Sequence, residues 1–180
     1  EKTMEETGKI SCSNTKTKKG ELGIKAKLAD MLLKVKINGD MDLMKAIEIL
    51  LWEEEEINNG TVFDQQIINE HTEEYDLFIN HVKQFNLEYL SDTCGVPVEQ
   101  IKRAASVFAS KKKIIACWAM GLTQHKNAVD TIKEIVNLLL LKGSIGKPGA
   151  GTCPVGGHSN VQGERKRGIY EKRSKQLFDS

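Results

Sequence analysis

The chain has few prolines, no closely spaced cysteines and almost no net charge. It contains three prolines and four cysteines, and its 26 basic side chains nearly balance 25 acidic ones. No Cys-x-x-Cys pair occurs, which argues against a zinc or iron–sulfur site built from this segment alone. The balanced charge gives no indication of nucleic-acid or membrane-surface binding. We interpret the cysteines as reduced thiols, which predicts a cytoplasmic protein.

Long hydrophobic runs are also absent. No stretch of about eighteen apolar residues occurs, so no transmembrane helix is predicted. No secretory signal is visible either. The chain begins at Glu1 and not at Met, so the missing signal says little about a longer parent protein.

The apolar periodicity predicts alternating strands and helices between a polar start and a basic end. We divide the chain into a polar linker or loop (1–27), an α/β segment (28–163) and a basic tail (164–180). Lys/apolar alternation favours a strand over 30–37, and the continuous apolar run 114–119 is typical of a buried central strand of a parallel sheet. We therefore expect a Rossmann-like parallel sheet flanked by helices, as part of a larger multidomain protein.

Helix signals separate these two strands and follow the second one. The helices are expected at 40–56, within 64–83 as two short helices or one kinked helix, at 86–92, at 98–108 and at 127–142. In the first, Asp40 is placed to cap the helix, and Glu53 to Glu56 are expected to be solvated. The last is expected to begin with a capping-box variant and to bury one apolar stripe. That stripe comprises Val129, Ile132, Val136, Leu139 and Leu140.

Two loops leave the predicted strands at their carboxyl ends, where open α/β sheets bind ligands. In Asn38-Gly39-Asp40 the carboxylate suits hydrogen bonds from a purine or a ribose, and it equally suits a plain helix cap. In the loop 120–125, a glycine permits close backbone approach, and an amide and an imidazole follow it. The alternative is a strand–helix loop whose polar groups satisfy the backbone.

A glycine-rich stretch over 143–163 is the most informative part of the chain. It holds seven of the fifteen glycines and two of the three prolines, which is typical of a shaped functional loop. It is not a Walker phosphate loop, because no Gly-Lys-Ser/Thr opens a helix. The pattern alone indicates that backbone comes close to another group here.

Four ordered segments together resemble the molybdopterin oxidoreductases, and most closely their formate dehydrogenase alpha-subunit-like branch. The segments are Trp118-Ala-Met-Gly-Leu-Thr-Gln-His125, Glu134-Ile-Val-Asn-Leu138, Gly143-Ser-Ile-Gly-Lys-Pro-Gly-Ala-Gly151 and Gly157-His-Ser-Asn-Val-Gln-Gly163. The resemblance covers residues 28–170, and its most specific part is 117–163. Gly156 departs from the branch, which usually has arginine there to hold a small anionic substrate.

The resemblance implies a redox cofactor, bis-molybdopterin guanine dinucleotide with molybdenum or tungsten, in which the metal carries the chemistry. It implies a catalytic, substrate-side role for His158. The implied cofactor-binding residues are Asn38, Gly39, Asp40, Met120, Gly121, Gln124, His125 and Gly157. No metal ligand is assigned within the segment, and an iron–sulfur cluster is placed only in the parent protein.

The sequence therefore predicts the central cofactor-binding segment of a formate dehydrogenase-like enzyme, inactive as 180 residues alone. The implied partners are a small, formate-like substrate and an electron-transfer partner, without nucleic acid or a membrane segment. One alternative is a non-catalytic cofactor-binding or carrier module. Another is a nucleotide-binding α/β domain of a different family.

Overall fold

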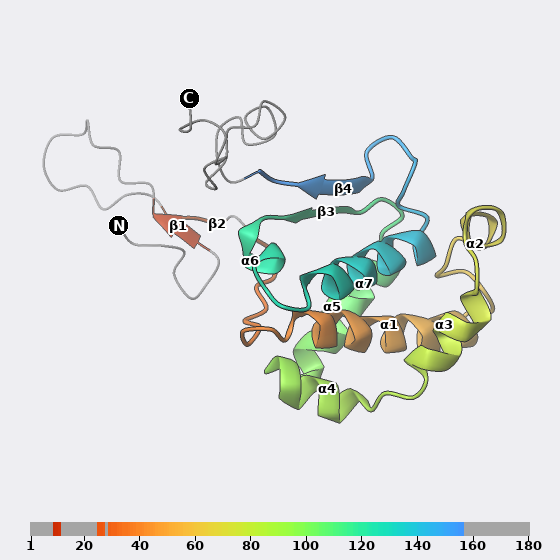
Figure 1. Ribbon diagram of the computed structural model, residues 1–180, viewed down its shortest axis with the longest axis horizontal. Coiled ribbons are helices and arrows are strands. Elements are labelled where there is room, and N and C mark those ends of the chain that lie inside the picture. The colour runs from red at the N-terminus through yellow and green to blue at the C-terminus, as the bar shows by residue number, and fades with distance from the viewer. Residues whose placement is uncertain (1–8, 12–24, 28, 157–180) are drawn as a thin grey trace, which may run out of the picture.

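The computed structural model describes residues 9–11, 25–27 and 29–156 (Figure 1). Its helices are α1 (Asp40–Ile57), α2 (Gln65–His71), α3 (Tyr75–Val82), α4 (Leu87–Cys94), α5 (Val98–Ser110), α6 (Met120–Thr123) and α7 (Ala128–Leu141). Its strands are β1 (Lys9–Ser11), β2 (Lys25–Lys27), β3 (Ile115–Trp118) and β4 (Gly151–Pro154). The two helices expected within 64–83 are confirmed as α2 and α3. None of the described helices is both long and apolar enough to cross a membrane.

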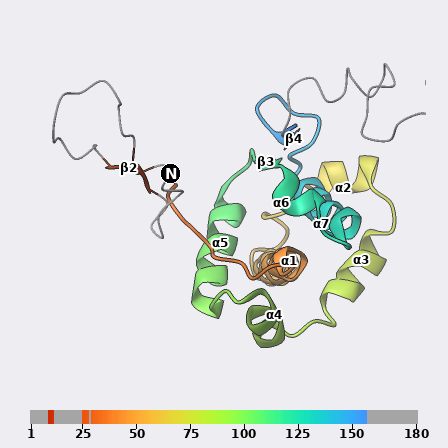
Figure 2. The same ribbon diagram turned by 60° about the vertical axis from the view of Figure 1, so that its left-hand side comes forward.

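Helix α1 forms the centre of the core. Figure 2 looks nearly along α1, and α3, α4, α5 and α7 surround it. Ile47 and Leu51 of α1 are at most 1% exposed, as are Leu90 of α4 and Ile101 of α5. Each such side chain contributes about 1.5–3 kcal/mol through burial, so the apolar face of α1 is the main packing surface of the helical core.

Both polar ends of α1 differ from the prediction. Gly39 occupies the N-cap position without a side-chain cap, and Asp40 is already the first helical residue. The expectation that Glu53 to Glu56 are solvated is wrong at Glu55, which is 6% exposed. After α1 the chain reverses through Asn59 and Gly60, both at positive φ, and brings backbone amides back onto this carboxylate.

The segment predicted as a strand at 30–37 is extended but pairs with no strand among the described residues. Its alternation is nevertheless real, since Met31, Leu33 and Val35 pack against the helical core while Lys36 is exposed. The Lys36 amide donates to the Cys94 carbonyl at the end of α4, at 2.8 Å. Every second side chain of this segment is therefore covered by the helices of the core, and the alternation does not require a sheet.

Strands β3 and β4 form a parallel two-stranded sheet that pairs Ile115 with Gly151 and Trp118 with Pro154. The prediction of a strand in a parallel sheet at 114–119 is confirmed by β3, but its expected burial is wrong, because β3 alternates exposed and half-buried residues and Ile115 is 56% exposed. β4 is the only strand paired with β3 in the described part of the chain. The fold is compatible with the α/β class, whereas the Rossmann-like sheet and the multidomain context stay predictions.

The buried face of α7 differs in part from the predicted apolar stripe. Val129, expected in the core, is 67% exposed, whereas Ala128, Thr131 and Ile135 are buried. Leu139 is buried, as the prediction has it. The helix contacts α1, α2 and α6, so apolar side chains occur on two adjacent faces and periodicity does not choose between them.

The residues around α7 and at the start of the chain also differ from the sequence-based expectation. Asn127 stands at the N-cap of α7 but makes no side-chain cap hydrogen bond, so the capping-box variant is wrong. The expected loop 120–125 contains the single-turn helix α6. Within the polar start, β1 and β2 pair antiparallel, with Ile10 opposite Ala26.

Candidate functional site

The two predicted strand-end segments lie toward the same end of the helical body. In Figure 1, β3 leads into α6 at the left, and the turn before α1 lies on that side as well. The parallel β4 also ends there, just before the sequence that contains Gly157 and His158. Those two residues lie outside the described part of the chain, so their predicted roles stay predictions.

The turn before α1 is held by the backbone of α4. The Gly39 amide donates to the Lys36 carbonyl at 2.9 Å, and Asn38 between them has a φ of 69°. A Cβ atom on Gly39 would lie 2.8 Å from Cys94 Cα. Glycine is therefore required at this position by packing within the chain itself.

The side chains beside Gly39 are free to meet another molecule. Asn38 is exposed and Asp40 is half-buried, and neither makes a side-chain hydrogen bond to another described residue. Asp40 lies in the first turn of α1, where the helix dipole favours a negative charge. The pair offers an amide and a carboxylate at the surface, a donor–acceptor combination suited to a purine edge or a ribose.

The second segment, α6 and its flanks, is open on its outer side. Met120 is 42% exposed, and no atom lies within 4 Å of the Cβ position of Gly121. The exposed Gln124 amide donates to the Met120 sulfur at 3.5 Å, a weak contact. No packing requirement within the described chain explains the glycine at 121, in contrast to Gly39.

The turn into α7 carries one unpaired buried polar atom. His125 is half-buried, and its carbonyl accepts from the Ala128 amide at 3.2 Å. Oδ1 of Asn127 is buried and has no hydrogen-bond partner in the part of the chain that the structure describes. Buried polar atoms are normally paired, so this amide is a candidate for a contact from outside the described residues.

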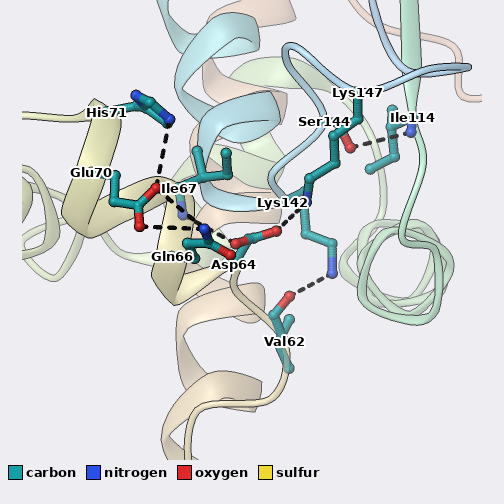
Figure 3. Close-up of polar contacts among 10 residues, drawn as sticks. All are labelled: Val62, Asp64, Gln66, Ile67, Glu70, His71, Ile114, Lys142, Ser144 and Lys147. Atoms are coloured by element: carbon teal, nitrogen blue, oxygen red, sulfur yellow. Dashed lines mark hydrogen bonds and ion pairs between the residues drawn. The ribbon is translucent and has the colours of Figure 1, made fainter.

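The first half of the glycine-rich loop contacts its own chain. A Cβ atom on Gly143, whose φ is 57°, would lie 2.3 Å from Asp64 Oδ2. Lys147 forms an ion pair with Asp64, and this hydrogen bond is the main cause that lowers the pKa of Asp64 (Figure 3). The close approach indicated by the glycines is therefore, in this half of the loop, an approach to the residue that caps α2.

A buried lysine and a buried serine hold the start of this loop. Lys142 Nζ donates to the carbonyls of Val62 at 2.7 Å and Ala109 at 3.0 Å. Ser144, fully buried, accepts from the Ile114 amide at 3.2 Å (Figure 3). The sequence does not predict either role, because both depend on partners 30 or more positions away.

The candidate site is an open surface. One cavity of about 570 Å³ lies between α2, α3 and α7, and a second of about 370 Å³ lies around residues 60–65. The residues 38–40 and 120–125 line neither of these two cavities. Within the described residues no three His, Cys, Asp or Glu side chains are grouped to hold a metal ion. The surface can form hydrogen bonds with a ligand through its exposed polar side chains.

No family model matches the chain, but several curated proteins do. An uncharacterized oxidoreductase of Mycobacterium tuberculosis is 40% identical over 97% of this chain and 22% of its own length. The probable oxidoreductase YjgC of Bacillus subtilis is 34% identical over 82% of the chain and 14% of its own length. Formate dehydrogenase H of Escherichia coli is 32% identical over 77% of the chain and 18% of its own length.

The chain thus spans about a fifth of the length of these relatives, or less. The similarity extends over most of this chain in each case, and two of the three proteins are named oxidoreductases while the third is named a dehydrogenase. These relatives support an oxidoreductase family for the chain, and the link to formate dehydrogenases is the weaker part of that support.

Proposed function

We propose that this chain is the central cofactor-binding segment of a molybdopterin-dependent, formate dehydrogenase-like oxidoreductase. The observation that carries the proposal is the similarity to formate dehydrogenase H, 32% identity over 138 residues, together with the ordered motifs between residues 117 and 163. The whole protein transfers two electrons to or from a small, formate-like substrate and passes them to an electron-transfer partner.

The surface formed by residues 38–40 and 120–125 offers features that suit a long, polar cofactor. Such a ligand needs backbone that it can approach and polar side chains that are not already paired. Gly121 has open space where a side chain would stand, and Asn38 and Asp40 have no described partner. Gly39 gives no support for a ligand here, because its close contact with Cys94 already explains why this residue is a glycine.

The proposal gives each residue a role in binding. Asn38 and Asp40 hydrogen-bond a guanine or ribose group, and Met120, Gln124 and His125 border the cofactor beside Gly121. Gly157, which lies outside the described residues, is assigned to cofactor binding, and His158, also outside them, is assigned to the substrate. When bound, molybdenum or tungsten and its dithiolenes supply the two-electron chemistry, and these residues bind and orient the group. An iron–sulfur cluster, where one is present, belongs to another part of the protein.

The first test is metal and nucleotide analysis of the whole protein, purified from its native host. Molybdenum or tungsten with about two guanine nucleotides released per chain supports the enzyme. Guanine nucleotide without metal favours the non-catalytic cofactor carrier, for which Gly156 in place of an arginine is the motivating feature. Finding neither contradicts both.

Single substitutions then test the site. Asp40→Ala and Gln124→Ala are expected to lower cofactor occupancy severalfold while leaving the circular dichroism spectrum unchanged. Asp76→Ala is the matched control for the first, because Asp76 also lies in the first turn of a helix and is exposed. Gln100→Ala, exposed on α5, is the control for the second. Unchanged occupancy in both site variants would refute this placement of the cofactor.

A further inference from the structure

Two cysteines face each other across the small sheet. The parallel register of β3 and β4 pairs Cys117 directly with Cys153. Both are exposed and both are free thiols. Cys94, in contrast, is fully buried in the helical core. The pairing is not visible in the sequence, where the two residues belong to different segments.

The backbone geometry of this pair suits a disulfide bond. Adjacent strands lie about 4.7–4.9 Å apart, within the Cα–Cα range of about 4.4–6.8 Å found in disulfides. Paired residues of parallel strands project from the same face. Along β3, Cys117 is exposed while its neighbours Ala116 and Trp118 are half-buried, so the thiol belongs to the outer face.

The two thiols also interact with each other. The pKa of Cys117 is raised by partial desolvation and then by the neighbouring Cys153 thiol. Two thiols that pair across adjacent strands on an exposed face are accessible to a small oxidant and need little backbone movement to join.

We propose that Cys117 and Cys153 form a reversible cross-strand disulfide, which makes the β3–β4 sheet a redox-sensitive site of this protein. The bond fixes the register of the two strands immediately before α6 and before Val155, where both strands end. The inference depends only on the paired register and exposure of the two cysteines, and it stands whether or not the proposed cofactor binds.

The reaction balances with a small-molecule disulfide such as oxidised glutathione as the oxidant. The thiolate of one cysteine attacks a sulfur of the oxidant, and one glutathione leaves as a thiolate. The thiolate of the second cysteine then attacks the protein sulfur of this mixed disulfide and displaces the second glutathione. Two cysteine thiols are oxidised, one glutathione disulfide is reduced to two thiols, and the two cysteine protons pass to the released thiolates.

Peptide mapping tests the proposal directly. The full chain, purified in reductant, is equilibrated in glutathione buffers of increasing oxidised fraction, quenched with N-ethylmaleimide and digested with trypsin. Cleavage gives the peptide 114–126, with Cys117 as its one cysteine, and the peptide 143–165, with Cys153, because the Lys147–Pro148 bond resists trypsin. The expected result is a joined pair of these peptides that separates again in reduced glutathione.

Built-in controls distinguish this bond from unspecific oxidation. Protection of Cys94 from maleimide before denaturation shows that the chain is folded. Cys117→Ser is expected to abolish the joined peptide and to leave Cys153 reduced or as a glutathione adduct, and Cys153→Ser gives the reverse. Separate peptides throughout the redox range, or equal linkage of either cysteine to Cys94, would overturn the proposal.

Discussion

Glu48 carries the most specific thermodynamic prediction for this fold. It lies on α1 and is 1% exposed, and neither carboxyl oxygen has a hydrogen-bond partner among the described residues. Burial, followed by the nearby Glu134, raises the pKa of Glu48 well above its ordinary value of 4.5, and Lys45 opposes this shift. The folded protein therefore keeps a proton on Glu48 at pH values where the unfolded chain releases it.

The sign of the pH dependence follows from this proton. The contribution of protonated Glu48 to the free energy of unfolding is fully present below about pH 4.5, and it is lost as the pH rises through the pKa of Glu48 in the folded protein. Over that window the free energy of unfolding falls by up to about 1.4 kcal/mol per pH unit. In Glu48→Gln the side chain has the same shape and no titrating proton, so this component disappears. The variant's stability relative to the original protein therefore increases with pH.

The assay is urea unfolding of both proteins, followed by circular dichroism, at closely spaced pH values from about 4 to about 8. Subtracting one free energy of unfolding from the other removes the pH dependence that both proteins share, so the remaining pH dependence is that of Glu48. Glu53→Gln, on the exposed side of the same helix, provides the baseline for removing one carboxylate from α1. A difference that stays flat across the range would refute a protonated, buried Glu48.

Three further substitutions test other contacts by urea unfolding. Glu55→Gln weakens the bonds that this carboxylate accepts from two loop amides at 2.6 and 2.8 Å, so a loss of about 1.5–3 kcal/mol is expected and no loss would contradict it. Lys142→Met leaves two carbonyls unpaired and is expected to cost about 2–5 kcal/mol. Gly39→Ala, which forces a contact with Cys94, is expected to cost about 1–3 kcal/mol, whereas Gly121→Ala changes stability by less than about 0.5 kcal/mol.

Sequence signals located the helices well where stop residues and apolar spacing agree. Asn58 and Gly60 end α1, and Gly143 follows the end of α7, as the sequence predicts. The signals gave wrong predictions where one local pattern fits two structures and tertiary packing decides between them. The alternation of 30–37 fits either a strand or an extended segment on a helical layer, and only the location of α4 and α5 decides between them.

Charged residues with structural roles were the least predictable part. Glu55 belongs to a run of four glutamates that is typical of a solvated helix end, yet it alone of the four is buried. The one signal in the sequence was the Asn59-Gly60 reversal directly after the helix, which returns the next amides to its last turn. The Lys142 and Ser144 contacts had no such local signal, because the chain segments they join are far apart in sequence.

The candidate site shows what a glycine in a motif does and does not indicate. Gly39 and Gly121 were both assigned to the cofactor, but a side chain at 39 collides with Cys94 whereas a side chain at 121 meets open space. A larger side chain at position 39 therefore lowers the stability of the fold whether or not a cofactor binds there. A loss of cofactor occupancy in such a variant could come from unfolding or from a blocked site. Bulk at 121, in Gly121→Leu, leaves the chain folded, and a loss of occupancy in the whole protein then reports on ligand approach alone. Of the two glycines, Gly121 is the one whose substitution separates cofactor binding from folding.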